Sequence, residues 1–114
     1  MNDNLRMVRG DTFAFGIEIT GLNQDLDSAY FTCKENYDDE TPIFQKSLSD
    51  GIEKDEETST EDTYYYKVRV APEDTYNVEA KNYYYDLEIG ANSDIYTILK
   101  GILRIENDVT REEE

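Results

Sequence analysis

Hydrophobic and polar residues alternate along most of this chain with a period of two. The pattern is clear in four segments, at residues 12–20, 28–35, 63–71 and 83–89. Alternation of this kind is typical of β-strands with one buried face. The residues predicted to be buried are Phe13, Phe15, Ile17, Ile19, Ala29, Phe31, Cys33, Tyr64, Tyr66, Val68, Val70, Tyr83, Tyr85, Leu87 and Ile89.

Three further segments, at residues 6–9, 43–48 and 95–105, have a shorter or less regular strand pattern. No segment has the period of an α-helix, although Pro suits the first turn of a single helical turn at residues 72–77. Seven or eight short strands separated by turns predict an all-β fold, an antiparallel immunoglobulin-like β-sandwich. The length of 114 residues predicts one domain, residues 1–114.

The last strand is expected to change its buried face within its own length. A β-bulge at Lys100-Gly101 would shift the register at this point. The inward residues are then Tyr96 and Ile98 before the bulge, and Leu103 and Ile105 after it.

The turn at residues 72–77 lies where the chain must cross from one sheet to the other. Asp74 and Thr75 can accept hydrogen bonds from nearby backbone N–H groups there. The hydroxyl of Tyr83 or Tyr85 is expected to bond back to this turn, as in a tyrosine corner. These residues are therefore predicted to have a structural role.

The composition is strongly acidic, with 27 acidic and 11 basic residues and a net charge of −16. This balance argues against direct binding to nucleic acid or to an anionic membrane, because both need concentrated Lys and Arg. We predict that residues 53–62 form a mobile acidic loop and that residues 111–114 form a frayed tail. The chain has neither a membrane-spanning run nor the apolar core of a signal peptide, so we expect it in the cytoplasm.

Few residues are suited to catalysis or to metal binding. The chain has no histidine, and its one cysteine, Cys33, is expected to be an inert thiol in the core. The acidic clusters lack the ligand spacing of a calcium loop. A glycosidase that uses only carboxylates is compatible with the residue types, but no insertion predicts a cleft. We therefore predict no enzymatic activity, no metal and no cofactor.

Two segments with three consecutive tyrosines supply the candidate interface. In each triplet two tyrosines point inward and only the middle one points outward. If the segments 63–71 and 83–89 pair, their outward side chains form one exposed patch. Its members are Tyr65, Lys67, Arg69, Tyr84, Asp86 and Glu88.

Several short segments together carry a resemblance. They are Arg9-Gly10-Asp11-Thr12-Phe13, Ala71-Pro72-Glu73-Asp74-Thr75, Tyr83-Tyr84-Tyr85-Asp86-Leu87-Glu88-Ile89, Tyr96-Thr97-Ile98-Leu99-Lys100-Gly101 and Asp108-Val109-Thr110-Arg111. In their order and spacing the chain resembles small phage and prophage proteins with an immunoglobulin-like β-sandwich, from the tail and baseplate genes of phages of Gram-positive bacteria. The N-terminal domain of baseplate upper proteins is similar. The resemblance implies a structural role in the virion and no catalytic residues.

Three functions follow as hypotheses. The first is a structural or adaptor component of a phage tail or baseplate, present in many copies and docking by strand addition at residues 6–9 or 43–48. The second is an acidic mimic of nucleic acid that inhibits a host defence nuclease. The third is a carbohydrate-binding sandwich, for which the candidate exposed aromatics are Tyr30, Tyr37, Tyr65 and Tyr84.

Overall fold

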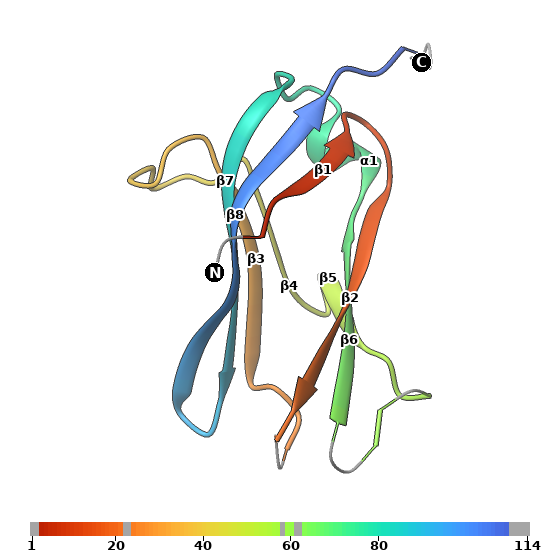
Figure 1. The fold of residues 1–114 in the computed structure, drawn as a ribbon, viewed down its shortest axis with the longest axis vertical. Helices are drawn as coiled ribbons and strands as arrows, with labels where there is room; N and C mark the ends of the chain where they lie inside the picture. The colour runs from red at the N-terminus through yellow and green to blue at the C-terminus, as the bar shows by residue number, and fades with distance from the viewer. Residues whose placement is uncertain (1–2, 22–23, 58, 61–62, 110–114) are drawn as a thin grey trace.

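The computed structural model describes residues 3–21, 24–57, 59–60 and 63–109. These residues form eight strands and one helical turn, with overall dimensions of 45 × 32 × 22 Å (Figure 1). The elements are β1 (Leu5–Val8), β2 (Phe13–Thr20), β3 (Ser28–Lys34), β4 (Phe44–Leu48), β5 (Gly51–Lys54), β6 (Thr63–Val70), α1 (Pro72–Thr75), β7 (Lys81–Ala91) and β8 (Asp94–Glu106). The predicted all-β fold is confirmed.

The eight strands hydrogen-bond in the order β1-β8-β7-β3-β4-β5-β6-β2. The sheet is mixed, because β1 runs parallel to β8 and β4 runs parallel to β5. The expectation of a purely antiparallel sheet is therefore wrong. β1 and β8 come from opposite ends of the chain, so no hairpin dictates their relative direction.

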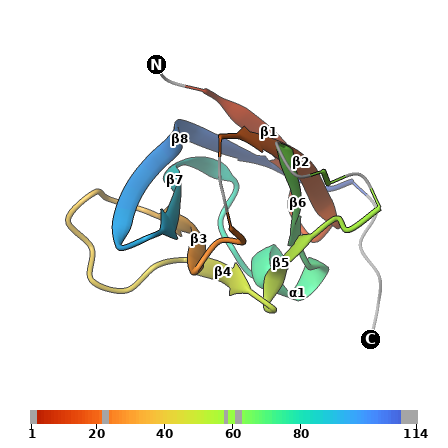
Figure 2. The same ribbon diagram turned by 90° about the horizontal axis from the view of Figure 1, so that it is seen from below.

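The sheet curls until it forms a nearly closed barrel (Figure 2). The junction between β4 and β5 consists of only two residue pairs, Ser47 with Gly51 and Leu48 with Ile52. It joins a larger wall, made of β1, β8, β7, β3 and β4, to a smaller wall, made of β5, β6 and β2. The apolar side chains fill the space between these walls.

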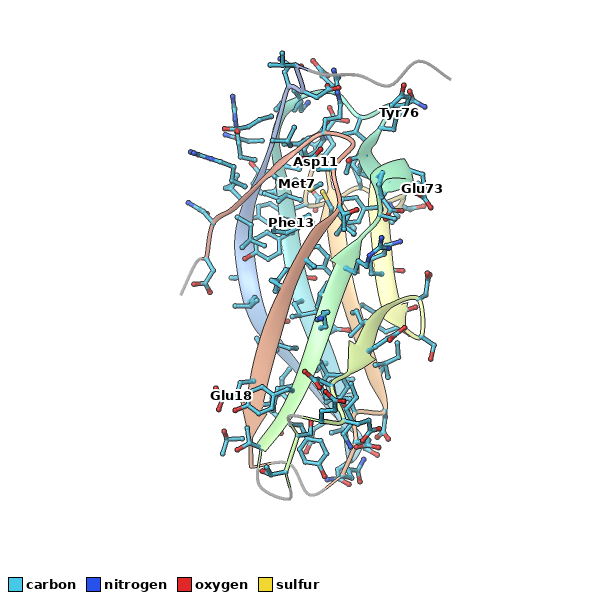
Figure 3. The ribbon with its side chains drawn as sticks, turned by 90° about the vertical axis from the view of Figure 1, so that its right-hand side faces the viewer. Met7, Asp11, Phe13, Glu18, Glu73 and Tyr76 are labelled. Atoms are coloured by element: carbon cyan, nitrogen blue, oxygen red, sulfur yellow. The ribbon has the colours of Figure 1, made fainter. Side chains whose placement is uncertain are left out.

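The alternation along the chain predicts the core well. Phe31, on β3, is fully buried, and its ring lies 5.4, 5.9 and 5.6 Å from the rings of Phe15, Phe44 and Tyr85. The predicted inward residues of β3 and β7 are all buried. Those of β2 are half-buried, because β2 is the last strand of the sheet, whereas its outward Glu18 is exposed (Figure 3).

The β-bulge lies earlier in β8 than predicted. Leu87 pairs with Leu99 and the next residue, Glu88, pairs with Thr97, so Ile98 is the additional residue. The predicted position, Lys100-Gly101, is therefore wrong by two residues. Two adjacent apolar residues, Ile98 and Leu99, are the sequence signal of this shift.

The predicted burial along β8 is only half correct. Leu103 and Ile105 are buried, as expected. Tyr96 and Ile98 are exposed to 51% and 37%, so their predicted burial is wrong. Ile98 is the additional residue of the bulge, whereas Tyr96 pairs with the buried Ile89 but is itself exposed near the start of the strand. Leu99 instead continues the inward series towards the core.

The acidic segment at residues 53–62 is partly a strand. Its first two residues belong to β5, which pairs with β6. Beyond β5, the Asp55 N–H donates to the Tyr65 carbonyl at 2.7 Å. One apolar residue, Ile52, is too little to predict a strand from its pattern. Residues 58, 61 and 62 of this segment and the tail at residues 111–114 lie outside the described residues.

The predicted helical turn is α1, which links β6 to β7 at one end of the molecule. The Asp74 carboxylate accepts the Ala71 N–H at 2.7 Å and pairs with Lys46 of β4 at 2.8 Å. The fully buried Thr75 hydroxyl accepts the Gly10 N–H at 2.9 Å. Gly10 has φ of +82°, a conformation that glycine adopts without steric cost.

A tyrosine corner is formed by Tyr83, although its partner lies two residues beyond the predicted turn at residues 72–77. Its hydroxyl donates to the Glu79 carbonyl at 2.5 Å. The Tyr85 hydroxyl instead donates to the Asp3 carbonyl, which lies outside the corner. The two inward tyrosines of this strand therefore anchor different segments.

We predict that Tyr83→Phe lowers the free energy of unfolding by about 1 kcal/mol, because the Glu79 carbonyl loses its donor while the ring stays in the core. Urea denaturation measures this change. Tyr84→Phe is the matched control, since the Tyr84 hydroxyl has no hydrogen-bond partner among the described residues. Equal stability of the two variants would contradict a stabilising role for the corner.

Candidate functional site

The six predicted interface residues lie in two groups on different walls of the molecule. Tyr65, Lys67 and Arg69 project from β6, and the other three project from β7. β6 pairs with β2 and β5, whereas β7 pairs with β3 and β8. The pairing on which the single patch depends does not occur, and Figure 1 shows the two strands on opposite sides.

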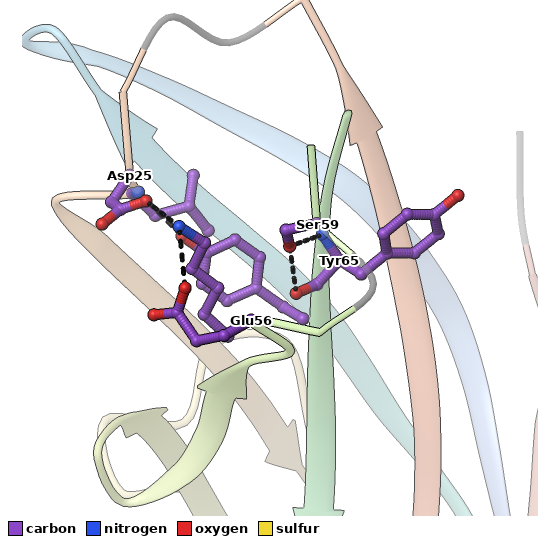
Figure 4. Close-up of polar contacts among 7 residues, drawn as sticks. Asp25, Glu56, Ser59 and Tyr65 are labelled. Atoms are coloured by element: carbon purple, nitrogen blue, oxygen red, sulfur yellow. Dashed lines mark hydrogen bonds and ion pairs between the residues drawn. The ribbon is translucent and has the colours of Figure 1, made fainter. Parts of the chain in front are cut away.

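On β6, Tyr65 is held by local polar contacts. Its hydroxyl donates to the Glu18 carboxylate at 3.2 Å, and this hydrogen bond raises the Tyr65 pKa. Its backbone N–H donates to the Ser59 hydroxyl at 2.9 Å (Figure 4). Lys67 and Arg69 line a hollow that they share with acidic residues and no aromatic ring. The contacts of Tyr65 with Glu18 and Ser59 indicate a structural role for this residue.

On β7, the other three residues line a groove of about 630 Å³ on the outward face of β3, β4, β7 and β8. This volume lies within the range of about 300–1,000 Å³ that is usual for small-molecule sites. The strand register sets its floor in rows: Glu88 is opposite Tyr30, Asp86 is opposite Thr32, and Tyr84 is opposite Lys34.

An exposed pair of stacked rings lies at one end of this groove. Tyr37, in the β3–β4 connection, stacks on Tyr84 with ring centroids 4.1 Å apart and an interplanar angle of 27°. Tyr37 is exposed to 70%. Tyr30 is exposed at the other end of the same surface. Three of the four aromatics that sequence reasoning nominated for carbohydrate binding therefore share one groove, and Tyr65 does not.

Asp86 lies at the centre of the floor. Burial raises the pKa of its carboxyl group, although attraction from Lys34 and Lys100 acts in the opposite direction. Within the described part of the chain, neither lysine forms an ion pair with it. Beside it, Gln45 donates to the Thr32 hydroxyl at 2.9 Å. The floor thus offers both hydrogen-bond donors and acceptors.

Other kinds of site have little support. Among the described residues, no group of three or more His, Cys, Asp or Glu side chains is placed to hold a metal ion. Cys33 is buried, as expected, and burial raises the pKa of its thiol to about 12, which disfavours the reactive thiolate. No helix in the described ranges is long and apolar enough to cross a membrane.

A second exposed feature is the outer edge of β8 near its start. β1 pairs with β8 only from Leu103 to Glu106, and the Asp3 N–H donates to the Lys100 carbonyl at 2.8 Å. Before Lys100, the described strands pair with β8 on its β7 side only. Ile95, Tyr96 and Ile98 are exposed there to 60%, 51% and 37%. We call residues 94–99 the open β8 edge.

Sequence reasoning missed two parts of these surfaces. It did not connect Lys34 and Lys100 with the groove, because their neighbours depend on which strands pair. It also treated Tyr96 and Ile98 as core residues. Of the edges that it proposed, β1 is an outer strand, as expected, whereas β4 has β3 on one side and β5 on part of the other.

The comparisons with known proteins do not identify a family. No family model matches the chain, and no curated protein matches it either.

We predict that Asp86→Asn gains stability relative to the natural chain as the pH rises from about 3 to 7. The raised pKa means that the folded state binds the Asp86 proton more tightly than the unfolded state does. The natural chain therefore loses this contribution as pH rises through the unfolded and then the folded pKa. The asparagine variant does not ionise, so the stability difference should move in its favour.

Urea denaturation at several pH values measures this difference. Glu88→Gln, which removes the next outward carboxylate of β7, controls for the general effect of one less negative charge. A difference that shifts towards the natural chain as the pH rises would mean that attraction to the lysines outweighs burial.

Proposed function

We propose that this chain is a non-enzymatic structural or adaptor domain of a phage or prophage particle, in the tail or baseplate. The open β8 edge is the observation that carries a role in protein–protein contact. The resemblance of the sequence to phage tail and baseplate proteins is the reason for proposing that the partner belongs to a phage particle. Under this proposal the chain folds in the cytoplasm of the bacterial host and is then built into the virion in many copies.

The open β8 edge suits strand addition. Unpaired N–H and C=O groups at a sheet edge can hydrogen-bond to an extended segment of another chain, and exposed side chains give that contact its specificity. Three large apolar side chains, Ile95, Tyr96 and Ile98, are exposed within four residues. The occupant that we propose is an extended segment of a neighbouring protein of the particle.

Local charge supports docking at this edge. The segment at residues 94–100 contains one acid, Asp94, and one base, Lys100, in a chain whose net charge is −16. An acidic partner segment would be repelled elsewhere on the surface but not here. The lysines and Arg69 that project from both walls also interrupt the acidic surface, which favours this role over mimicry of nucleic acid.

We further propose that the fold is a variant of the immunoglobulin-like sandwich. The neighbours β8-β7-β3 and β2-β6-β5 correspond to the strand orders G-F-C and B-E-D of that fold, and a tyrosine corner lies at the start of β7. The departure is β1, which pairs with β8 instead of β2.

Particle membership is tested on virions purified from the host strain after prophage induction. We expect mass spectrometry to find the chain in these particles at a copy number comparable to the tail or baseplate proteins. A chain that is abundant in the lysate and absent from purified particles would overturn the proposal.

The role of the edge is tested by Ile98→Lys, which places a charge within the proposed contact. We expect incorporation of this variant into particles to fall about tenfold or more, because an unpaired charge at the centre of an interface is costly. Val109→Lys is the matched control, since Val109 is also exposed but lies beyond the end of β8. Equal loss in both variants would remove the edge from the proposal.

A further inference from the structure

We propose that the groove formed by β3, β4, β7 and β8 binds a neutral oligosaccharide. This groove is a separate surface from the open β8 edge, and oligosaccharide binding in it does not require docking at that edge. The proposal rests on the placing of three tyrosines around a floor of hydrogen-bonding side chains.

The floor is long enough for an extended ligand. Tyr30 and Lys34 lie four residues apart on β3, so their rows are separated by about 13 Å at the usual rise of a strand. Tyr84, opposite Lys34, carries the stacked Tyr37 at one end, and Tyr30 lies at the other. A chain of linked rings would meet an aromatic side chain at both ends.

The middle row supplies the polar contacts. It runs across four strands as Gln45, Thr32, Asp86 and Lys100. Carboxylate, amide, hydroxyl and ammonium groups together can both accept and donate hydrogen bonds. Hydroxyl groups of a sugar have the same dual capacity, whereas an apolar ligand would leave this row unpaired at a cost.

Charge argues against other ligands. Lys34 and Lys100 face Glu40, Asp86 and Glu88, so the groove is close to neutral in a chain of net charge −16. Nucleic acid requires an excess of basic residues, and a strongly basic peptide would be better matched by the acidic surface outside the groove. A neutral, polar ligand is the class that this lining favours.

The stacked tyrosines are placed for contact with a ligand. The ring of Tyr37 touches Tyr84 on one side, yet the residue remains 70% exposed. One exposed ring would need no explanation, but Tyr37, Tyr84 and Tyr30 are gathered in one groove, and grouped apolar surface of this kind marks a contact with another molecule. Aromatic faces supply large contact areas at low cost in conformational entropy.

The proposal is tested by screening the full chain against a glycan array and then titrating soluble oligosaccharides, including tetramers of N-acetylglucosamine and of glucose, by calorimetry. We expect saturable binding of at least one neutral oligosaccharide. Tyr37→Ala and Asp86→Asn should each weaken it about tenfold or more. Tyr65→Ala is the matched control, because Tyr65 projects from the opposite wall, and it should bind normally.

Folding of each variant is checked by circular dichroism, and Tyr37→Ala is expected to fold because Tyr37 is outside the core. The absence of any array signal, or binding that Tyr37→Ala and Asp86→Asn leave unchanged, would overturn the proposal. Loss of particle incorporation by the groove variants without glycan binding would instead assign this face to a protein partner. Glycan binding by Ile98→Lys at the normal level would show that the two surfaces act separately.

Discussion

The hydrogen bond from the Gly10 N–H to the buried Thr75 hydroxyl joins the turn after β1 to the helical turn α1, and the rest of the fold depends on this junction. A buried polar group without a partner is costly, so α1 and the turn after β1 are fixed relative to each other. Arg9, next to Gly10, donates to Asp108 at 3.0 Å and to the Val78 carbonyl. The first turn, the α1 corner and the segment after β8 therefore meet at one end. The Arg9-Gly10-Asp11 tripeptide belongs to this framework.

This closed end determines what the rest of the molecule can expose. β1 runs towards the corner, ends there and pairs with the last four residues of β8, so the start of β8 keeps an open edge. The corner also directs β6 and β7 into different walls, which separates their outward tyrosines. Tyr84 consequently faces Lys34 of β3, and the groove is assembled from strands that are distant in the sequence.

The sequence was informative wherever local pattern decides the outcome. Alternation identified the buried faces of β3, β6 and β7, and Pro72 marked α1, because side-chain direction and turn formation depend on neighbouring residues. It failed for β5, for the bulge at Ile98 and for the two parallel pairings. These depend on which strands meet across the barrel. The same limit applies to the sites. Tyr84 and Asp86 point outward, as predicted, but the prediction placed them beside the outward residues of β6, whereas they lie beside those of β3 and β8.

The two proposed surfaces are compatible because of how a sheet grows. A strand added beside the open β8 edge would continue the sheet that contains β8, β7, β3 and β4, and would leave its outward face uncovered. Lys100, whose side chain lines the groove, lies immediately after that edge. Outward side chains of an added strand would therefore extend the groove floor beyond Lys100. A chain docked in a particle would in this way keep its tyrosines accessible to a ligand, and the docking partner would help to shape the site.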